Sequence, residues 1–380
     1  MPREDVLRAF ELDPGFVHLN HGSYGAVPRE VRLEQDRWRA TIERNPTGFY
    51  QDEYPPLIRA TAEHVARRLG GDAKDWVFCE NATAAVNGVL QSLDLGPGDE
   101  ILTTSHAYGA VTKAMALTAR RCGAKLCIAD VPPLVSDDEE VSDAIAERLG
   151  PCTRLLVVDH MTSQTATVFP IWRIAQIARA AGVPLLVDGA HAPGQLGLDV
   201  PALGADWYTG NAHKWLFAPR GCGVLWTRPE WQTVTRPAVL SHGTDQGYAE
   251  AFDWIGTRDP SPWLSFEAAA LAHDGFGGEA LMAGNRSRAA EGAEEIAAAL
   301  SAKIAGPAAM RGSMAALLLR VNYDSLEGAA AYRRKLASEH RIMVPVYVFA
   351  GALWLRISAQ IYNAPDDYHR LSTACRDMLA

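Results

Sequence analysis

The chain has 380 residues, of which 48% are hydrophobic and 21% are charged, proportions typical of a folded globular protein rather than a disordered one. This length predicts two domains or one large domain. The net charge of −9 and the absence of a basic block disfavour nucleic acid and anionic membranes as partners, and no apolar run approaches the ~20 residues that span a bilayer. The charged N-terminus, Met1–Asp5, lacks the apolar stretch of a signal peptide, and no two cysteines have C-x-x-C spacing, so we expect a cytoplasmic protein with reduced thiols.

Alternating helix and strand patterns fill the first two thirds of the chain. In chain order they predict a helix over Leu57–Leu69, a strand over Trp76–Cys79, a helix over Thr83–Leu93, a strand over Glu100–Thr103, a helix over Gly109–Arg121, a strand over Lys125–Ala129, a helix over Val141–Leu149, a strand over Arg154–Val158, a helix over Ile171–Ala181, and strands over Pro184–Val187, Asp206–Tyr208 and Gly223–Trp226. Mostly apolar strands separated by helices are typical of an α/β fold with a mainly parallel sheet. We therefore expect a sheet of seven strands, with ligands beyond the carboxyl ends of the strands.

The pattern changes near residue 262, where the strands become fewer and the helices longer and richer in alanine. It predicts helices over Pro262–Asp274 and Glu279–Ala305, a strand over Ala315–Val321, a helix over Leu326–Glu339, strands over Ile342–Val348 and Leu353–Ile357, and a terminal helix over Pro365–Met378. We interpret this part as a smaller α+β domain. The expected division is a large domain over 20–260 and a small domain formed by 1–19 and 261–380.

Several common catalytic and nucleotide-binding motifs are absent from the sequence. It contains no G-x-x-x-x-G-K-[ST], no H-E-x-x-H and no G-x-S-x-G. The stretch Gly275–Ala280 fits G-x-G-x-x-A, but it follows a predicted helix rather than a strand, which disfavours a dinucleotide site. We therefore do not expect the large sheet to serve NAD or ATP, and a nicotinamide-dependent oxidoreductase is a disfavoured alternative.

The residues after the predicted strands are those that one cofactor would need. An electrophilic aldehyde needs a lysine to form a Schiff base, and of the six lysines only Lys214 follows a strand of the large sheet in a loop with glycine and histidine. A pyridine ring that acts as an electron sink needs a carboxylate at its nitrogen, and Asp188 follows the strand Pro184–Val187. A phosphate needs main-chain N–H donors at a helix start, which Ala82 and Thr83 supply.

A residue that stacks on the ring is also required, and His106 and Tyr108 are both candidates because they come soon after the strand Glu100–Thr103. Taken singly, these residues also have ordinary structural explanations, such as a helix cap or a solvated surface. Together they indicate pyridoxal 5′-phosphate (PLP).

Eight sequence blocks occur in an order that is similar to the class V aminotransferase group of fold-type I PLP enzymes, and to its isopenicillin N epimerase-like branch. The blocks are His18–Gly25, Asn81–Thr83, Ser105–Gly109, Asp159–Ser163, Asp188–His191, Asn211–Lys214, Gly256–Asp259 and Arg356–Asn363. This resemblance covers nearly the whole chain and implies the fold-type I PLP-dependent transferase fold.

The resemblance implies roles for the cofactor-binding residues. Lys214 forms the internal aldimine and moves the Cα proton, Asp188 binds the pyridine nitrogen, and His191 lies near the ring hydroxyl, where Ser163 also takes the place of a hydrogen-bonding residue. His106 stacks on the ring, with Tyr108 as a competitor for that place. Four residues hold the phosphate: Ala82, Thr83, Asn211 and His213.

The resemblance also implies a substrate side and a partner. Arg356 clamps the substrate α-carboxylate with a bidentate pair, and Asn20, His21 and Gly22 line the entrance. Thr257 reaches the phosphate of a neighbouring subunit, which implies a homodimer with shared sites. We expect no metal.

The implied reaction proceeds at Cα of an amino acid or an amino-acid-containing secondary metabolite, as in antibiotic biosynthesis, through an external aldimine and a carbanion. Epimerisation and transamination are the leading outcomes; the alternative is a C–S lyase or a decarboxylating deaminase that acts on a cysteine-conjugated intermediate. A persulfide-forming desulfurase is disfavoured because Arg341–Leu355 contains no cysteine. Epimerisation needs a second proton donor, for which His21, Tyr24 and Tyr347 are candidates. A cofactor-free binding protein on the same fold is disfavoured because Lys214, Asp188 and Arg356 are all present.

Overall fold

The computed structural model describes residues 3–379. Met1, Pro2 and Ala380 lie outside the described residues. Two sequence predictions extend to these residues: an N-terminus without a signal peptide, and a small domain formed by 1–19 and 261–380. None of the described helices is long and apolar enough to cross a membrane.

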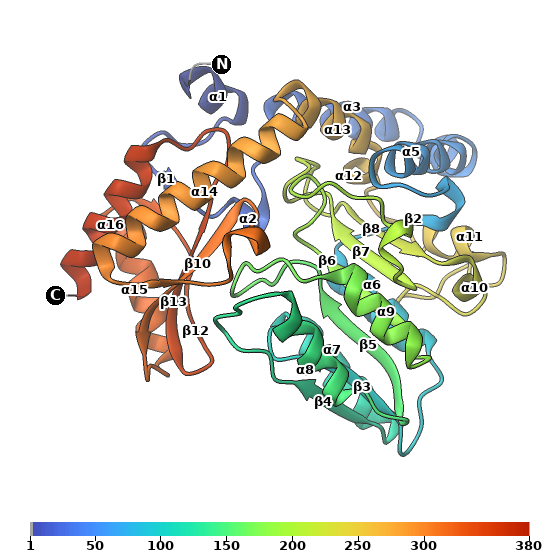
Figure 1. Cartoon of the computed structure of the whole chain (residues 1–380). Helices are drawn as coiled ribbons and strands as arrows, with labels where there is room; N and C mark the ends of the chain where they lie inside the picture. The colour runs from blue at the N-terminus through green and yellow to red at the C-terminus, as the bar shows by residue number, and fades with distance from the viewer. Residues whose placement is uncertain (1–2, 380) are drawn as a thin grey trace.

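A seven-stranded sheet forms the larger part of the molecule (Figure 1). Its strands, in spatial order, are β2 (Trp76–Cys79), β8 (Gly223–Thr227), β7 (Trp207–Asn211), β6 (Leu185–Gly189), β5 (Thr153–Asp159), β3 (Glu100–Thr104) and β4 (Lys125–Ala129). β8 pairs antiparallel with both β2 and β7, and the other pairs of this sheet are parallel. The predicted mainly parallel sheet of seven strands is therefore confirmed.

Successive residues of these strands enter two different cores, because side chains alternate between the faces of a sheet. Trp76 and Phe78 pack with helices on one face, whereas Val77 and Cys79 pack with helices on the other. The first face is covered by α3 (Arg29–Arg44), α5 (Tyr54–Leu69), α8 (Asp138–Arg148), α9 (Ile171–Ala180), α12 (Ser261–Leu264) and α13 (Phe266–Gly275). The second is covered by α6 (Ala82–Ser92), α7 (Gly109–Cys122) and α11 (Tyr248–Asp253).

A second, antiparallel sheet of four strands lies beside the first, on the left of Figure 1. Its strands are β12 (Val346–Phe349), β13 (Ala352–Ser358), β10 (Met314–Val321) and β9 (Lys303–Ile304), and its helices are α14 (Glu279–Leu300), α15 (Leu326–Glu339) and α16 (Pro365–Leu379). The N-terminal stretch joins this part, because β1 (Val17–His18) pairs in parallel with β11 (Ile342–Met343). The division into domains of 20–260 and of 1–19 with 261–380 stays a prediction.

Three predicted elements differ from the structure. The helix predicted over Glu279–Ala305 ends at Leu300, because Ser301 adopts a left-handed conformation and the chain turns into β9. The helix predicted over Pro262–Asp274 is divided at Ser265 into α12 and α13. The strand predicted over Ile342–Val348 is two strands in different sheets, since Pro345 lies between them and proline cannot donate to a sheet ladder.

The structure also contains short elements that the sequence patterns did not indicate. They are α1 (Arg3–Phe10), α2 (His21–Tyr24), α4 (Pro46–Gly48), the π-helical turn η1 (Phe49–Glu53), α10 (Pro229–Gln232) and the 3₁₀ turns η2 (Ala73–Asp75), η3 (Pro201–Leu203) and η4 (Ala308–Met310).

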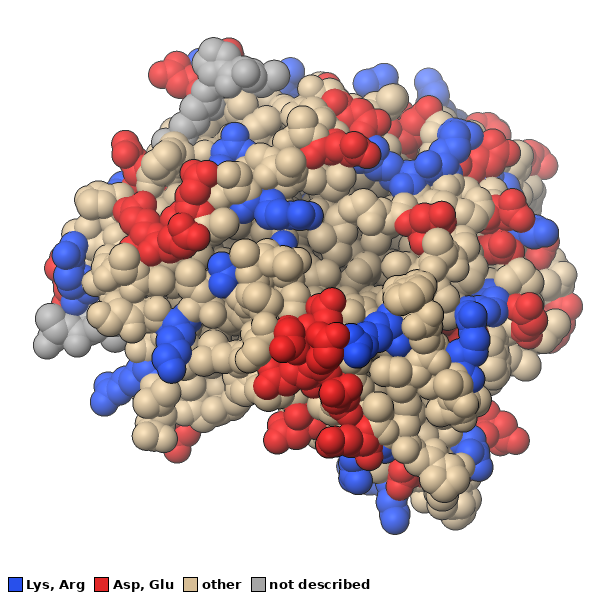
Figure 2. All heavy atoms as spheres, in the orientation of Figure 1, with Lys and Arg blue, Asp and Glu red and all other residues tan. Residues whose placement is uncertain are grey.

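Charged side chains of both signs are interspersed on the face drawn in Figure 2, where one acidic group lies over α8. The first turn of that helix carries Asp138, Glu139 and Glu140. Carboxylates at this end are stabilised by the partial positive charge of the helix N-terminus, so the group has a structural explanation.

Candidate active site

Lys214 lies at the carboxyl end of the large sheet, in the loop that follows β7. The Lys214 Nζ is 3.2 Å from Nε2 of His191, which follows β6. Burial and, secondly, the charge of Arg356 lower the pKa of Lys214 to about 8, against the opposing effects of Asp188 and Asp159. The lysine is therefore a buried amine that can lose its proton near neutral pH, which suits both Schiff-base formation and proton transfer.

The main chain of Lys214 is held by the short helix α2. The His21 Nε2–H donates to the Lys214 carbonyl oxygen at 3.0 Å, and the His21 Nδ1 accepts from the Tyr362 hydroxyl at 2.9 Å. Burial lowers the pKa of His21 to about 3, so the ring is neutral. The adjoining Gly25 has φ +64° and approaches so closely that a Cβ there would lie 2.8 Å from the same carbonyl oxygen.

Two carboxyl groups end neighbouring strands beside this lysine. Asp159 of β5 and Asp188 of β6 are register partners in a parallel pair, and both are buried. One Asp188 oxygen accepts the Ala190 N–H at 3.0 Å. Burial raises the pKa of both carboxyls, and the charge of Asp188 raises that of Asp159 further. A cationic ring nitrogen next to Asp188 would offset this burial cost, since an opposite charge favours the ionised form.

The start of α6 is the cradle in which the phosphate is expected, and two of its main-chain N–H groups already donate to side chains. The Asn81 side chain caps this helix by accepting the Ala84 N–H at 2.9 Å, and the Asn211 Oδ1 accepts the Ala82 N–H at 2.8 Å. Gly223 makes room for the turn, because a Cβ there would lie 2.7 Å from the Asn81 Cα. Thr83 is half-buried at the first turn, where N–H groups and the helix dipole favour an anion.

His213 lies beside this cradle in the lysine loop. The His213 Nδ1–H donates to the Cys222 carbonyl oxygen at 3.0 Å, and burial lowers the pKa of the ring to about 4. The Nε2 atom of such a neutral ring is an acceptor. It can donate to a phosphate only when the ring is protonated, which a bound dianion would favour.

Arg356 of β13 brings the small sheet into the site. Its Nη1 donates to the carbonyl and hydroxyl oxygens of Ser163, and its Nη2 donates to the Ser23 hydroxyl at 3.1 Å. Burial lowers the pKa of Arg356. Ser23 in turn donates to the Asn20 side chain at 2.6 Å. Ser23 was not among the predicted site residues, although it lies inside the His18–Gly25 block, which is the one signal that could have identified it.

The short helix α2 lies between the two sheets in Figure 1, and its Gly22 is closely packed. A Cβ at this position would lie 2.5 Å from the Met314 sulfur and 3.3 Å from the Trp215 ring, and the Gly22 N–H donates to the Ser358 hydroxyl at 3.1 Å. Asn20, His21 and Gly22 are thus brought to the site. Asn20 contacts Arg356 through Ser23. His21 bonds to the Lys214 main chain, and Gly22 packs against the side chains of Met314 and Trp215.

The two candidates for ring stacking have different environments. His106 is fully buried, its Nε2–H donates to the carbonyl oxygens of Val131 and Pro132, and its Nδ1 accepts from the Thr165 hydroxyl at 2.8 Å. Tyr108 is 44% exposed, and its hydroxyl is close enough to Arg356 to influence the pKa of the guanidinium. Of the two, Tyr108 therefore has the ring that is free to cover a bound ligand.

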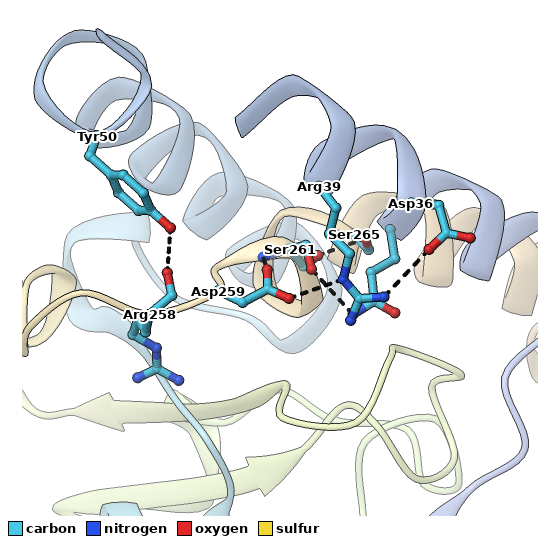
Figure 3. Close-up of polar contacts among 8 residues, drawn as sticks. Asp36, Arg39, Tyr50, Arg258, Asp259, Ser261 and Ser265 are labelled. Atoms are coloured by element: carbon cyan, nitrogen blue, oxygen red, sulfur yellow. Dashed lines mark hydrogen bonds and ion pairs between the residues drawn. The ribbon is translucent and has the colours of Figure 1, made fainter. Parts of the chain in front are cut away.

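Thr257 lies apart from these residues, exposed on a loop that two other elements fix. Arg39 of α3 donates to the Asp259 carboxylate at 3.0 Å, and the Tyr50 hydroxyl donates to the Arg258 carbonyl oxygen (Figure 3). The Arg258 side chain pairs with Glu80 at 2.7 Å, directly before the α6 cradle, and lies over the Trp263 ring at 3.8 Å. The Arg258–Glu80 ion pair therefore joins this loop to the residues that precede α6.

These residues fit PLP in charge and in hydrogen-bonding capacity. The Nδ1 of His191 and the Nε of Arg356 are among the buried atoms that have no partner in the described residues. Buried donors without partners are costly, so a ligand with acceptor oxygens would satisfy them. No group of three or more metal-ligating side chains occurs in the part of the chain that the structure describes.

Comparisons with known proteins identify the family of the chain. Residues 31–327 match the family model described as "Aminotransferase class-V". The chain is 34% identical to isopenicillin N epimerase of Amycolatopsis lactamdurans, covering 97% of this chain and 96% of the relative. It is 30% identical to a probable chloroplastic L-cysteine desulfhydrase of Arabidopsis thaliana, covering 97% and 84%.

Among solved structures, a variant of C-DES with glycine covalently linked to its PLP cofactor has a TM-score of 0.83 at 22% identity, covering 98% of this chain and 99% of that one. This similarity shows the fold, and the resemblance inferred from the eight blocks is confirmed by the family match. The cofactor is PLP, and the protein is an enzyme. The chain belongs to the class V aminotransferase family and is similar to its isopenicillin N epimerases.

Proposed function

We propose that the protein acts at Cα of an amino acid or an amino-acid-containing secondary metabolite, as an epimerase or aminotransferase. The observation that carries this proposal is the half-buried Lys214, whose amine is influenced by the carboxyl of Asp188 and the guanidinium of Arg356. When bound, PLP supplies an electron sink that stabilises negative charge at Cα. The side chains around the cofactor would transfer the proton and bind the substrate carboxylate.

Lys214 is the group that accepts and returns the proton. Its pKa of about 8 places the change of charge near neutral pH, where an amine is an effective base and its ammonium an effective acid. His191, whose pKa is lowered by burial, stays neutral beside the Lys214 Nζ and can orient the amine without competing for its charge.

Arg356 is placed to bind the substrate carboxylate. Ser163 and Ser23 fix the plane of its guanidinium, and the unpartnered Nε leaves a donor for an incoming anion. A bidentate pair would hold the carboxylate in one orientation and therefore fix the Cα–H bond relative to Lys214. We assign ring stacking to Tyr108 rather than His106, because both nitrogens of His106 are already bonded inside the protein.

We also propose a homodimer in which Thr257 completes the phosphate site of the neighbouring subunit. Support comes from the loop around Thr257, which is exposed at Thr257 itself, while Arg39, Tyr50 and Glu80 hold the two residues that follow it. A rigid exposed loop can deliver a hydroxyl to a partner at little entropic cost. Sedimentation of the holoenzyme would test this assembly, and a monomer at working concentration would refute it. A cytoplasmic location and a part in antibiotic biosynthesis stay predictions.

The first experiment asks whether the cofactor is attached to Lys214. The purified protein should be yellow, and borohydride should remove the visible band and fix the added mass on the peptide that contains Lys214. Lys214→Ala should abolish turnover while retaining the fold. Full activity of this variant would refute the proposal.

The second experiment identifies the reaction by incubation with L-amino acids and cysteine conjugates in heavy water. Deuterium at Cα with inverted chirality would establish epimerisation, and exchange of the amine for a ketone would establish transamination.

The three candidates for the second proton donor have different environments. His21 bonds at both nitrogens, and Tyr347 donates to the Gln164 carbonyl oxygen. Tyr24 is 71% exposed.

A second candidate function is C–S cleavage of a cysteine-type substrate. The observation that favours it is the similarity over nearly the whole chain to proteins described as L-cysteine desulfhydrases. The segment before Arg356 lacks a cysteine, so cleavage would release the sulfur group directly instead of transferring it to the protein. Release of a thiol from a cysteine conjugate, with an unmodified protein mass, would identify this reaction.

A further inference from the structure

Gln195 is a buried polar residue that the proposed chemistry does not use. It lies in the loop after β6, four residues beyond His191, and its side chain is almost completely inaccessible to solvent. A buried amide is costly unless both its N–H and its carbonyl groups are hydrogen-bonded. The partners of the Gln195 amide therefore indicate what this residue holds in place.

The two ends of the Gln195 amide bind main-chain groups from different parts of the molecule. Its Nε2 donates to the His191 carbonyl oxygen at 2.8 Å, and its Oε1 accepts the Ser313 N–H at 2.6 Å. The chain comes so close at Gly312 that a Cβ there would lie 2.7 Å from the Gln195 Oε1. Gln195 therefore joins the loop after β6 of the large sheet to the residue that precedes β10 of the small sheet.

Both ends of this connection lead to groups of the candidate site. At one end, the His191 Nε2 lies 3.2 Å from the Lys214 Nζ. At the other end, the Ser313 carbonyl oxygen accepts the Ala359 N–H at 2.8 Å, three residues after Arg356. The strands β10 and β13 are paired along their length, and β13 carries Arg356. The amide thus connects the neighbour of the lysine to the strand pair that carries the arginine.

The side chain of Arg356 makes its own hydrogen bonds to other loops. Its guanidinium donates to Ser163, which follows β5, and to Ser23 of α2. Among the described residues, none of these bonds goes to the loop after β6, in which His191 lies. Productive geometry requires the carboxylate-binding group and the amine to be held precisely relative to each other, and supporting residues provide this.

We propose that Gln195 is a positioning residue, which holds the strand pair β10–β13 against the loop after β6 and so sets the position of Arg356 relative to Lys214. This rests on the proposed function, in which the arginine binds the substrate carboxylate and the lysine moves the Cα proton. Methionine at position 195 would have a similar size but no amide, so the Ser313 N–H and the His191 carbonyl would lose their partner. The arginine should then lie farther from the lysine.

The test uses PLP as the probe and measures how fast the visible band appears when PLP is mixed with apoenzyme over a range of pH. Arg356 helps to lower the pKa of Lys214 to about 8, so a more distant arginine should raise it, while Asp188 and Asp159 are unchanged. We expect Gln195→Met to raise the midpoint of the rate profile by about 0.5 pH unit or more, which makes capture at pH 7.4 about 3-fold slower or more. A midpoint equal to that of the parent would overturn the proposal.

Gln232→Met is the matched control. The Gln232 Nε2 also makes two bonds, to the Asp75 carboxylate at 2.7 Å and to the Thr227 carbonyl oxygen at 3.0 Å. Thr227 ends the antiparallel strand β8, so these bonds lie at the edge of the large sheet opposite the site. This variant should leave the midpoint unchanged. An equal shift in both variants would attribute the effect to a general loss of packing and would contradict the proposed role.

A double-mutant cycle tests whether Gln195 acts through the arginine. In an Arg356→Met background there is no charge to place, so adding Gln195→Met should slow capture by less than about 1.5-fold further. A full additional 3-fold loss would show that the proposal is wrong. If Gln195→Met does not fold, Gln195→Asn decides, because its shorter amide cannot reach both partners and a midpoint equal to the parent's would refute the role. A parent protein without a borohydride-sensitive visible band would instead refute the proposed function.

Discussion

The pKa of Lys214 gives a prediction that can be checked without knowing the substrate. The structure lowers this pKa from the ordinary 10.5 to about 8, chiefly by burial and secondly through Arg356. At pH 7.4 about a fifth of the Lys214 amines are then uncharged, against roughly one in a thousand for an exposed lysine. Since only the uncharged amine attacks an aldehyde, the apoenzyme should combine with PLP about two hundred times faster at this pH than an exposed lysine of equal reactivity would.

The measurement is the rate at which the visible band appears when PLP is mixed with apoenzyme over a range of pH. The rate should rise with pH and level off with a midpoint near 8. Two variants test which neighbouring charges set the pKa of Lys214. Arg356→Met removes the neighbouring positive charge and should raise the midpoint, whereas Asp188→Asn removes a negative charge and should lower it. A midpoint near 10 in the parent, or no displacement in either variant, would refute the electrostatic reasoning.

Three further predictions follow from the contacts of the site. Arg356→Lys should raise KM for an amino-acid substrate about 10-fold or more, because lysine cannot form the bidentate pair, and the visible band of the cofactor should persist; an unchanged KM in steady-state kinetics would contradict this role. Gly22→Ala should lower the free energy of unfolding by about 1–3 kcal/mol in a urea titration, because its Cβ would overlap the Met314 sulfur, and a neutral result would show that α2 can move aside. Thr257→Ala should weaken PLP binding about 10-fold in equilibrium titrations, while the control Thr41→Ala, at a half-buried position of α3, leaves it unaltered; equal effects would argue against a contact with the phosphate.

The large sheet was predictable from sequence because its strands are short apolar runs bounded by clear turns. All seven strands occur within a few residues of their predicted bounds. The helix α3 was not predicted, since only Val31 and Ile42 of its residues are buried and its apolar periodicity is correspondingly weak. The strand prediction over Ile342–Val348 failed for a different reason, because the choice of sheet for each half depends on tertiary pairing with β1 or β13.

The site likewise has features that could be predicted from the sequence and features that could not. Lys214 and Asp188 were identified because each is a chemical group that the cofactor requires, and Arg356 was identified through the family resemblance of the Arg356–Asn363 block. The structure places the three in mutual electrostatic range. The bond between Ser23 and Arg356 joins residues 333 positions apart, and no local pattern encodes it. The environments of His106 and Tyr108 depend on how the chain turns after β3, which sequence spacing alone does not determine.

The contacts of α2 have a consequence for how the enzyme is made. His21 bonds to the lysine 193 positions later, and Ser23 bonds to an arginine near the end of the chain. On the ribosome the two ends of these contacts emerge many seconds apart, so a nascent chain can complete the large sheet well before its reactive centre exists. The newly synthesised polypeptide should therefore become able to bind PLP only late in its folding. Contacts of such long sequence separation should also make this step slow.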